Sequence, residues 1–256
     1  MRHLAYFLGA GPGDPELLTR RAERLLAACH VVYLPPLYEE TFVELLDGKD
    51  LFVPFNFYFS ELITLIKKQL VNGPVAFLVP GDLTFYSPFQ ALVDVLGDRA
   101  VVVPGVGAAN AASALLKKTL DLPGFCSRAI IASPRTLGEG PDALTMGDLA
   151  APGVSLLIYM NNLPLTELVT QLRKGYGKDV AIALAHRIGL PDEEIIVATL
   201  DTIVAKVGNR DFFNLNSPNP RPALTLLLVG ESLAAVADPA WWDYRRDHIW
   251  KYQDNR

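Results

Sequence analysis

Short apolar runs alternate with segments of helical periodicity along the first 120 residues of the chain. The runs predict buried strands, and the segments between them predict helices because their apolar residues recur every three or four positions. The predicted strands are residues 4–8, 31–34, 51–53, 75–79 and 100–103, and the predicted helices are 15–29, 39–46, 61–70, 85–96 and 108–116. This alternation predicts a mainly parallel sheet with helices on both faces.

The second half of the chain has a different pattern, with strands predicted at residues 129–132, 154–160, 180–186, 195–200 and 224–229 and helices at 165–174 and 201–207. The connection Arg187–Asp192 is too short for a helix, so the strands on either side of it are predicted to pair antiparallel. The second sheet is therefore expected to be mixed. Residues 120–124 interrupt the first pattern, which predicts an N-terminal domain of residues 1–120 and a C-terminal domain of residues 121–256.

Two further segments lie outside these patterns. Residues 214–222 are rich in Asn and Pro, which predicts an exposed loop. Residues 241–246 predict an amphipathic helix, and its aromatic residues favour packing against the body of the protein over a role at a membrane.

Composition narrows the function classes. The chain has 256 residues and a net charge of −5, which argues against a basic nucleic-acid-binding surface. Cys29 and Cys126 form no paired motif, and the four histidines lack ligand-like spacing, so neither a disulfide scaffold nor a metal site is predicted. No apolar run is long enough to span a membrane, and no signal peptide precedes the first strand. We therefore expect a cytoplasmic protein.

The stretch GAGPGDPELLT, residues 9–19, follows the first predicted strand and has more than one interpretation. The stretch is consistent with a simple helix start, because Asp14 is a good N-cap and Pro15 suits the first helical position. As a dinucleotide-binding loop it is poor, because Asp14 replaces the third glycine and Pro12 and Pro15 lack amide donors. The negative charge of Asp14 also opposes a phosphate at the helix N-terminus. A cofactor bound here should lack phosphate at this point, a condition that S-adenosylmethionine meets.

Two more glycine turns follow predicted strands, in residues 79–86 (VPGDLTFY) and 103–109 (VPGVGAA). In open α/β sheets, ligands bind outside the carboxyl ends of the strands. Each turn alone is more simply a connection between a strand and a helix. Three such turns at three strand ends favour a binding site.

These three motifs, in this order and at these separations, resemble the tetrapyrrole methylases of cobalamin and sirohaem synthesis. The resemblance continues through residues 157–160, 176–187, 190–194, 198–200 and 224–230, and so spans nearly the whole chain. In the second half it is closest to the precorrin-4 C(11)-methyltransferase branch. The family's second motif commonly reads Gly-Asp-Pro, and Leu83 stands at its Pro position. Gly107, Ala108 and Ala109 stand where the family usually has Ser or Thr.

The resemblance implies a two-domain α/β enzyme, usually a homodimer, with its active site in the interdomain cleft. The enzyme would transfer a methyl group from S-adenosylmethionine to a small tetrapyrrole and release S-adenosylhomocysteine. The resemblance assigns cofactor contacts to Pro12, Pro80, Gly81, Asp82, Phe85, Gly107 and Ala108, and adenosine contacts from the second domain to Met160, Ile188 and Thr225. No catalytic residue and no metal ligand is implied.

The sequence indicates the substrate-binding residues less clearly than the cofactor-binding residues. The family's substrates carry many carboxylates, so arginines matter, and Arg187 is the predicted substrate contact. Arg135 and Arg221 are interpreted as surface residues, and His186 as a structural histidine in preference to a proton shuttle. The apolar stretches 34–38 and 55–59 predict either a lid over the substrate or a dimer interface.

Alternatives to this function stay open at the level of the sequence. Within the family they are the precorrin-2 C(20)-methyltransferase and a methylase of unassigned substrate. From other classes, the altered second and third motifs are compatible with a non-catalytic S-adenosylmethionine-binding protein, and a nucleotide-dependent oxidoreductase is disfavoured by the first loop.

Overall fold

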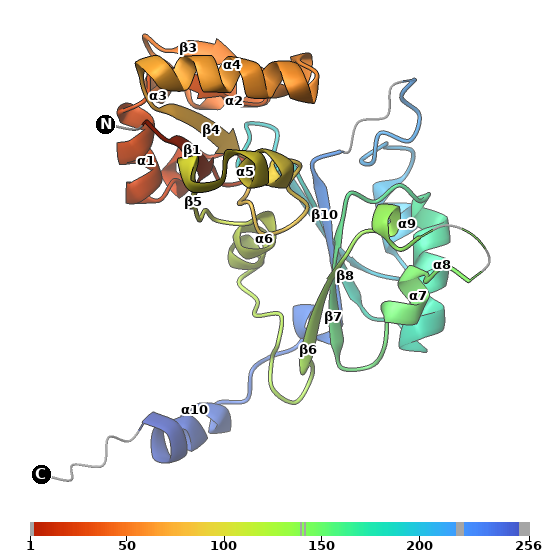
Figure 1. Ribbon diagram of the computed structural model, residues 1–256. Coiled ribbons are helices and arrows are strands. Elements are labelled where there is room, and N and C mark those ends of the chain that lie inside the picture. The colour runs from red at the N-terminus through yellow and green to blue at the C-terminus, as the bar shows by residue number, and fades with distance from the viewer. Residues whose placement is uncertain (1–2, 139, 141, 219–222, 251–256) are drawn as a thin grey trace, which may run out of the picture. The chain divides into compact units, whose positions relative to one another are not determined.

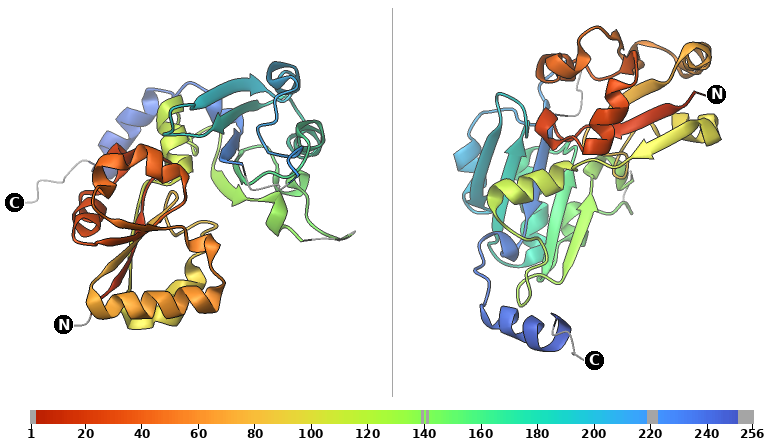
Figure 2. Two further views of the ribbon diagram at one scale, coloured as in Figure 1. Left: turned by 90° about the horizontal axis from the view of Figure 1, so that it is seen from above. Right: turned by 90° about the vertical axis from the view of Figure 1, so that its left-hand side faces the viewer.

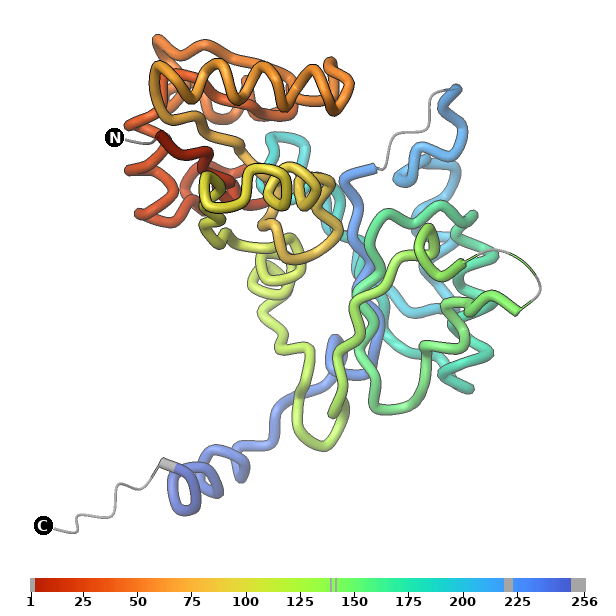
Figure 3. The backbone as a smooth tube through the Cα atoms, in the orientation of Figure 1, coloured from red at the N-terminus to blue at the C-terminus, as the bar shows by residue number. Residues whose placement is uncertain are grey.

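The computed structural model describes residues 3–138, 140, 142–218 and 223–250, which form two compact units. The first unit consists of Met1–Ala112 and Arg187–Glu193, and the second of Ser113–His186 and Glu194–Arg256. The backbone of each unit can be followed in Figure 3. Contacts in the folded chain do not test where independently folding domains begin, so the boundary at residue 120 stays a prediction.

The first unit contains a parallel five-stranded sheet in the order β3-β2-β4-β1-β5 (Figure 1). Its strands are β1 (Ala5–Gly9), β2 (Val31–Tyr33), β3 (Asp50–Phe52), β4 (Val75–Val79) and β5 (Ala100–Val103). β4 reads VAFLV and is buried along its whole length, as expected for a central strand covered on both faces. The predicted parallel sheet is confirmed.

Helices cover both faces of this sheet (Figure 2). On one face lie α1 (Arg20–Ala27), α2 (Leu37–Thr41) and α3 (Val43–Leu46), which share a core with Leu8, Val32 and Leu78. On the other face lie α4 (Phe59–Asn72) and α5 (Gln90–Leu96), which pack on Phe7, Val75 and Phe77. Alternate residues of each strand therefore point into different cores.

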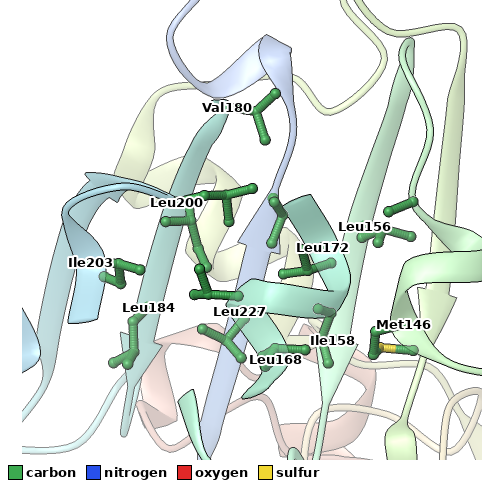
Figure 4. Packing of buried hydrophobic residues seen from close by; sticks show 14 of the residues in the cluster. Met146, Leu156, Ile158, Leu168, Leu172, Val180, Leu184, Leu200, Ile203 and Leu227 are labelled. Atoms are coloured by element: carbon green, nitrogen blue, oxygen red, sulfur yellow. The ribbon is translucent and has the colours of Figure 1, made fainter. Parts of the chain in front are cut away.

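The second unit contains a mixed five-stranded sheet in the order β6-β7-β10-β8-β9. Its strands are β6 (Arg128–Ala132), β7 (Val154–Tyr159), β8 (Ala181–His186), β9 (Glu194–Thr199) and β10 (Thr225–Val229). β6 runs parallel to β7, and the other neighbours pair antiparallel, including the predicted pair β8 and β9. Its helices are α7 (Met146–Leu149), α8 (Leu165–Tyr176) and α9 (Ile203–Val207), and Leu168 and Leu172 of α8 lie in the core with strand residues such as Leu227 (Figure 4). α6 (Ala108–Leu116) contains the division between the units.

Three predicted helices are shorter or more broken than the apolar pattern indicated. Residues 15–29 form the 3-10 turn η1 (Pro15–Leu17) and then α1, because Thr19 takes an extended backbone and its hydroxyl caps the amide of Ala22 at 3.2 Å. Residues 39–46 fall into α2 and α3, which are separated at Phe42. The helix predicted from residue 85 begins only at Gln90, after a loop in which Tyr86 has a left-handed backbone (φ +55°).

The C-terminal helix α10 (Ala240–Arg245) exists, but the expectation that it packs against the body of the protein is wrong. Each described side chain of residues 240–249 is exposed, and Trp242 retains 77% of its accessible surface. Part of the predicted loop 214–222, including Arg221, lies outside the described residues. Within the described part of the chain, no helix combines the length and the apolar character that crossing a membrane requires.

Helices α7 and α8 approach each other through two glycines, a contact that generates our first prediction. A methyl group on Gly175 would lie 2.6 Å from the carbonyl oxygen of Ala150, and one on Gly147 would lie 2.6 Å from that of Gln171. We expect Gly175→Ala to lower the free energy of unfolding by about 1–3 kcal/mol, because overpacking outweighs the better helix propensity of alanine. Urea denaturation measures this change.

Gly73→Ala is the control for this measurement, since a methyl group on Gly73 would meet no atom within 4 Å. Its free energy of unfolding should stay within about 0.5 kcal/mol of the wild type. A Gly175→Ala protein as stable as the wild type would contradict the close approach of the two helices.

Candidate functional site

Two of the three glycine turns are joined backbone to backbone in the first unit. Gly11 follows β1 and Gly81 follows β4, and the two residues exchange hydrogen bonds of 3.0 Å (Gly11 N to Gly81 O) and 2.8 Å (Gly81 N to Gly11 O). Both have left-handed backbones, with φ of +73° and +65°. Glycine adopts this conformation without the strain that other residues incur, so the sequence of the turns and their geometry agree.

The third turn packs against the other two. A methyl group on Gly105, which follows β5, would lie 2.5 Å from both the carbonyl oxygen of Gly81 and the carbonyl carbon of Gly9. β1 lies between β4 and β5 in the sheet, and this order brings the three strand ends together. We call Gly11, Gly81 and Gly105 with their flanking residues the glycine crossing.

The glycine crossing lacks the features of a phosphate cradle. The amides of Gly11 and Gly81 donate to each other's carbonyls, and the amide of Ala10 donates to Val79 O at 2.8 Å. The carboxylate of Asp14 accepts a hydrogen bond of 2.8 Å from the Glu16 amide at the start of η1, where an anion would otherwise be favoured. Pro12 has no amide to offer. These residues fit a cofactor that presents no phosphate to the turns.

The other predicted cofactor residues of the first unit lie on the same turns. Pro80 and Phe85 are exposed, while Pro12, Gly107 and Ala108 are half-buried. The backbone of Gly107 and Ala108 lies 3.7 Å from the position of a methyl group on Gly81. The structure therefore brings Gly107 and Ala108 next to Gly81, and the contacts of all these residues with a cofactor stay predictions.

Asp82 already has one structural partner. Its Oδ1 accepts a hydrogen bond of 2.9 Å from the amide of Thr84, which closes an Asx turn. The side chain is half-buried. The turn explains why an Asp follows Gly81 even without a ligand.

Residues 187–193 belong to the first unit, although they connect two strands of the second. A methyl group on Gly189 would lie 2.7 Å from the amide nitrogen of Asp14, and one on Gly13 would lie 2.7 Å from Cδ2 of Leu190. Ile188 and Leu190 are buried. Ile188 thus lies in a segment that groups with the first unit, and its contact with the adenosine of a cofactor stays a prediction.

Arg187, the predicted substrate contact, lies at the start of this segment with a left-handed backbone (φ +50°). Its Nε donates to Oδ1 of Asp192 at 2.6 Å, and Glu193 accepts from the amide of Gly189 at 2.8 Å. The Arg187 side chain is 32% exposed. The pairing with Asp192 orients the guanidinium, whose terminal nitrogens suit a substrate carboxylate, and this role stays a prediction.

Met160 and Thr225 lie at the same end of two neighbouring inner strands of the second sheet, β7 and β10. Thr225 pairs with His186 across β10 and β8, and the next residue, Leu226, pairs with Tyr159, the residue before Met160. Met160 has a left-handed backbone (φ +48°), and its carbonyl accepts a hydrogen bond of 3.1 Å from Nε of Arg135. Sequence reasoning treated Arg135 as a surface residue and missed this contact.

A hydrogen-bonded chain fixes His186. The Thr225 hydroxyl donates to Phe212 O at 2.6 Å, so it accepts from Nδ1 of His186 at 2.7 Å. The neutral imidazole therefore carries its proton on Nδ1. The ring also meets Phe212 edge-on at 5.0 Å. These partners favour the structural interpretation of His186. Among the described residues, no group of three His, Cys, Asp or Glu side chains is arranged to hold a metal ion.

Comparison with known proteins identifies the family. Residues 5–204 match the family described as tetrapyrrole (corrin/porphyrin) methylases. The chain belongs to the tetrapyrrole methylase family. It is accordingly a methyltransferase of a family that depends on S-adenosylmethionine, which confirms the predicted enzyme class and removes the oxidoreductase and non-catalytic alternatives.

Curated relatives cover nearly the full length of this methylase. A precorrin-4 C(11)-methyltransferase of Pseudomonas aeruginosa is 30% identical over 253 residues, with 97% of this chain and 98% of the relative covered. A cobalt-precorrin-4 C(11)-methyltransferase of Methanocaldococcus jannaschii is 27% identical, with 93% of this chain and 90% of the relative covered.

Solved structures share the fold of the methylase. A cobalt precorrin-4 methyltransferase superposes with a TM-score of 0.72 at 20% identity and covers 90% of this chain and 95% of its own. A uroporphyrin-III C-methyltransferase of Thermus thermophilus, solved with S-adenosylhomocysteine, gives a TM-score of 0.66 at 24% identity and covers 90% of this chain and 99% of its own. The predicted α/β fold with one parallel and one mixed sheet is confirmed.

The second prediction concerns Asp82, because one substitution can remove its charge and still keep its Asx turn. Asp82→Asn keeps an oxygen that accepts from the Thr84 amide but removes the charge. If Asp82 binds the cofactor, this variant should weaken S-adenosylhomocysteine binding by about 10- to 100-fold, as expected for a hydrogen bond to a charged group. Its melting temperature should stay that of the wild type, and calorimetry measures the affinity.

Asp14→Asn is the matched control, since Asp14 also accepts from an amide two residues further on but is not assigned to the cofactor. Its affinity should stay close to that of the wild type. Wild-type affinity in Asp82→Asn would show that Asp82 serves the turn alone.

Proposed function

We propose that this methylase transfers a methyl group from S-adenosylmethionine to C11 of a precorrin-4-type tetrapyrrole. The observation that carries the proposal is the glycine crossing, which suits a phosphate-free cofactor at the carboxyl ends of β1, β4 and β5. The choice of substrate is supported by the full-length similarity to a precorrin-4 C(11)-methyltransferase. The choice between a metal-free and a cobalt-containing substrate stays open, because both are named among the relatives.

The chain's task in such a reaction is alignment. The bound cofactor supplies an electrophilic methyl group, and its leaving group departs as a neutral thioether that needs no proton. Holding two reactants in line and excluding water contributes about 7–11 kcal/mol in the best cases. We propose that Pro80, Gly81 and Asp82 hold the methionine and ribose parts, and that Pro12 borders both cofactor and substrate. Arg187, oriented by Asp192, then holds a substrate carboxylate.

The alternative within the family is the precorrin-2 C(20) reaction or another tetrapyrrole. It is motivated by the departures at Leu83 and at Gly107 to Ala109, which alter side chains beside the glycine crossing. The resemblance that supports precorrin-4 lies largely in residues 176–200 of the second half. Both reactions use the same donor, so only product analysis separates them.

The test of this function, our third prediction, is mass spectrometry with methyl-labelled S-adenosylmethionine and a panel of precorrin-2, precorrin-4, cobalt-precorrin-4 and uroporphyrinogen III. We expect one labelled methyl group on a precorrin-4 substrate, at C11 by NMR. Calorimetry should show binding of S-adenosylhomocysteine and none of NAD, because the amides that would hold pyrophosphate are already bonded. Labelled product from precorrin-2 alone would favour the alternative, and NAD binding without S-adenosylhomocysteine binding would contradict the cofactor site.

We also propose that the protein is a homodimer. Its interface would use only one of the two apolar stretches predicted from the sequence, residues 55–59. Of the two apolar stretches predicted as lid or interface, residues 34–38 do not offer such a surface, since Leu34 and Tyr38 are buried. In residues 55–59, Phe57 packs partly against the core, whereas Phe55 and Tyr58 are 66% and 82% exposed. The exposed aromatic side chains of this stretch support the proposal, because homodimer interfaces favour aromatic residues.

The fourth prediction tests this interface with Phe55→Ser/Tyr58→Ser, which leaves the core residue Phe57 in place. Light scattering at micromolar concentration should give a dimer for the wild type and a monomer for the double variant. Val236→Ser is the control, because Val236 is equally exposed (82%) but lies far along the chain from this stretch. A monomeric wild type would contradict the proposal, and a dimeric double variant that has lost activity would favour the lid.

A further inference from the structure

A buried tyrosine touches the glycine crossing from the segment that follows β2. The hydroxyl of Tyr38 donates a hydrogen bond of 2.7 Å to the carbonyl oxygen of Gly11. The same oxygen accepts the amide of Gly81 at 2.8 Å. Tyr38 therefore bonds to the atom through which the first and second turns are joined.

The Tyr38 ring is held firmly. It is 1% exposed, packs against the ring of Phe42 at 5.0 Å between centroids, and belongs to the core that α1, α2 and β1 share. Pro35 and Pro36 precede it, and its amide donates to the carbonyl of Pro35 at 3.0 Å. A ring fixed on all sides positions its hydroxyl, and through it Gly11, with little freedom.

The chemistry of the hydroxyl fits a positioning role. Burial raises the pKa of Tyr38, and the nearby backbone amide of Gly81 acts against that shift, so the hydroxyl stays protonated and keeps donating at neutral pH. Gly11 and Gly81 are both glycines with left-handed backbones, which have more freedom than other residues and gain most from an external restraint.

We propose that Tyr38 is a positioning residue for the cofactor: its bond to Gly11 fixes the glycine crossing and so sets the orientation of the turn that contains Gly81 and Asp82. The inference rests on the proposed cofactor site at this turn. Tyr38 acts through Gly11 and not by contact with a ligand.

The test is Tyr38→Phe, which removes only the hydroxyl and keeps the buried ring. Without the hydroxyl, the dissociation constant for S-adenosylhomocysteine should rise about five- to tenfold, the effect of one ordinary hydrogen bond. Hydrogen exchange at the amides of Gly11 and Gly81, followed by NMR, should become faster because the crossing opens more often. The methylation rate at saturating cofactor should change less than the KM for S-adenosylmethionine.

Tyr33→Phe is the matched control. Tyr33 is also fully buried in the first unit, and its hydroxyl also makes one hydrogen bond, of 2.6 Å, to Oε1 of Gln69 on α4. Both variants lose one hydrogen bond of a buried tyrosine, which is buried for Tyr38 and part-buried for Tyr33, so both should lose some stability. Only Tyr38→Phe should lose cofactor affinity and protection at Gly11 and Gly81.

Equal dissociation constants in the two variants would overturn the inference, as would unchanged exchange at Gly11 and Gly81 in Tyr38→Phe. A wild-type protein that does not bind S-adenosylhomocysteine would overturn the proposed cofactor site instead. In that case, the hydrogen exchange measurement still decides whether Tyr38 fixes the glycine crossing.

Discussion

Direct contact between backbones, with no side chain between them, is the constraint on which the first unit depends. Gly9 and Gly105 touch at the ends of β1 and β5, and Gly11 and Gly81 exchange two hydrogen bonds at the ends of β1 and β4. A single methyl group on Gly105 would overlap two of the neighbouring backbones. β1 is the middle strand of the three, and this order brings the three strand ends close enough for such contact.

This constraint lies in the backbone, so it does not depend on the side chains beside the turns. Leu83, and Gly107 with the two alanines after it, differ from the residues that the family resemblance led us to expect. The joined turns are held by amides and carbonyls, which every residue except proline provides alike. Changes in neighbouring side chains therefore leave the shape of the turns intact and alter only what surrounds a ligand. In the second unit, by contrast, side chains make the link: the side chains of His186 and Thr225 are hydrogen-bonded to each other, and Thr225 is bonded to the backbone carbonyl of Phe212.

The sequence predicted those parts of the structure that depend on local patterns. β4 and β5 were predicted to the residue because Pro-Gly follows each apolar run, and the turns were predicted to converge because they follow parallel strands. Features set by distant contacts were not predictable in this way. α5 starts only after Tyr86, whose backbone is left-handed, and the hydroxyl of Tyr38 finds its partner in a carbonyl 27 residues away. The grouping of residues 187–193 with the first unit was also not predictable, because the chain order of a loop does not reveal which unit it packs on.

The segment 187–193 has a consequence for how the chain acquires its structure during synthesis. The glycine loop after β1 is completed by Gly189 and Leu190, which are made some 175 residues later than Gly13 and Asp14. A ribosome adds residues one after another, so the parallel sheet can assemble early, while its first loop stays without its final neighbours until β8 has been translated. A nascent chain therefore completes the loop after β1 only once β6, β7 and β8 have been translated, and β9 and β10 of the second sheet follow later still.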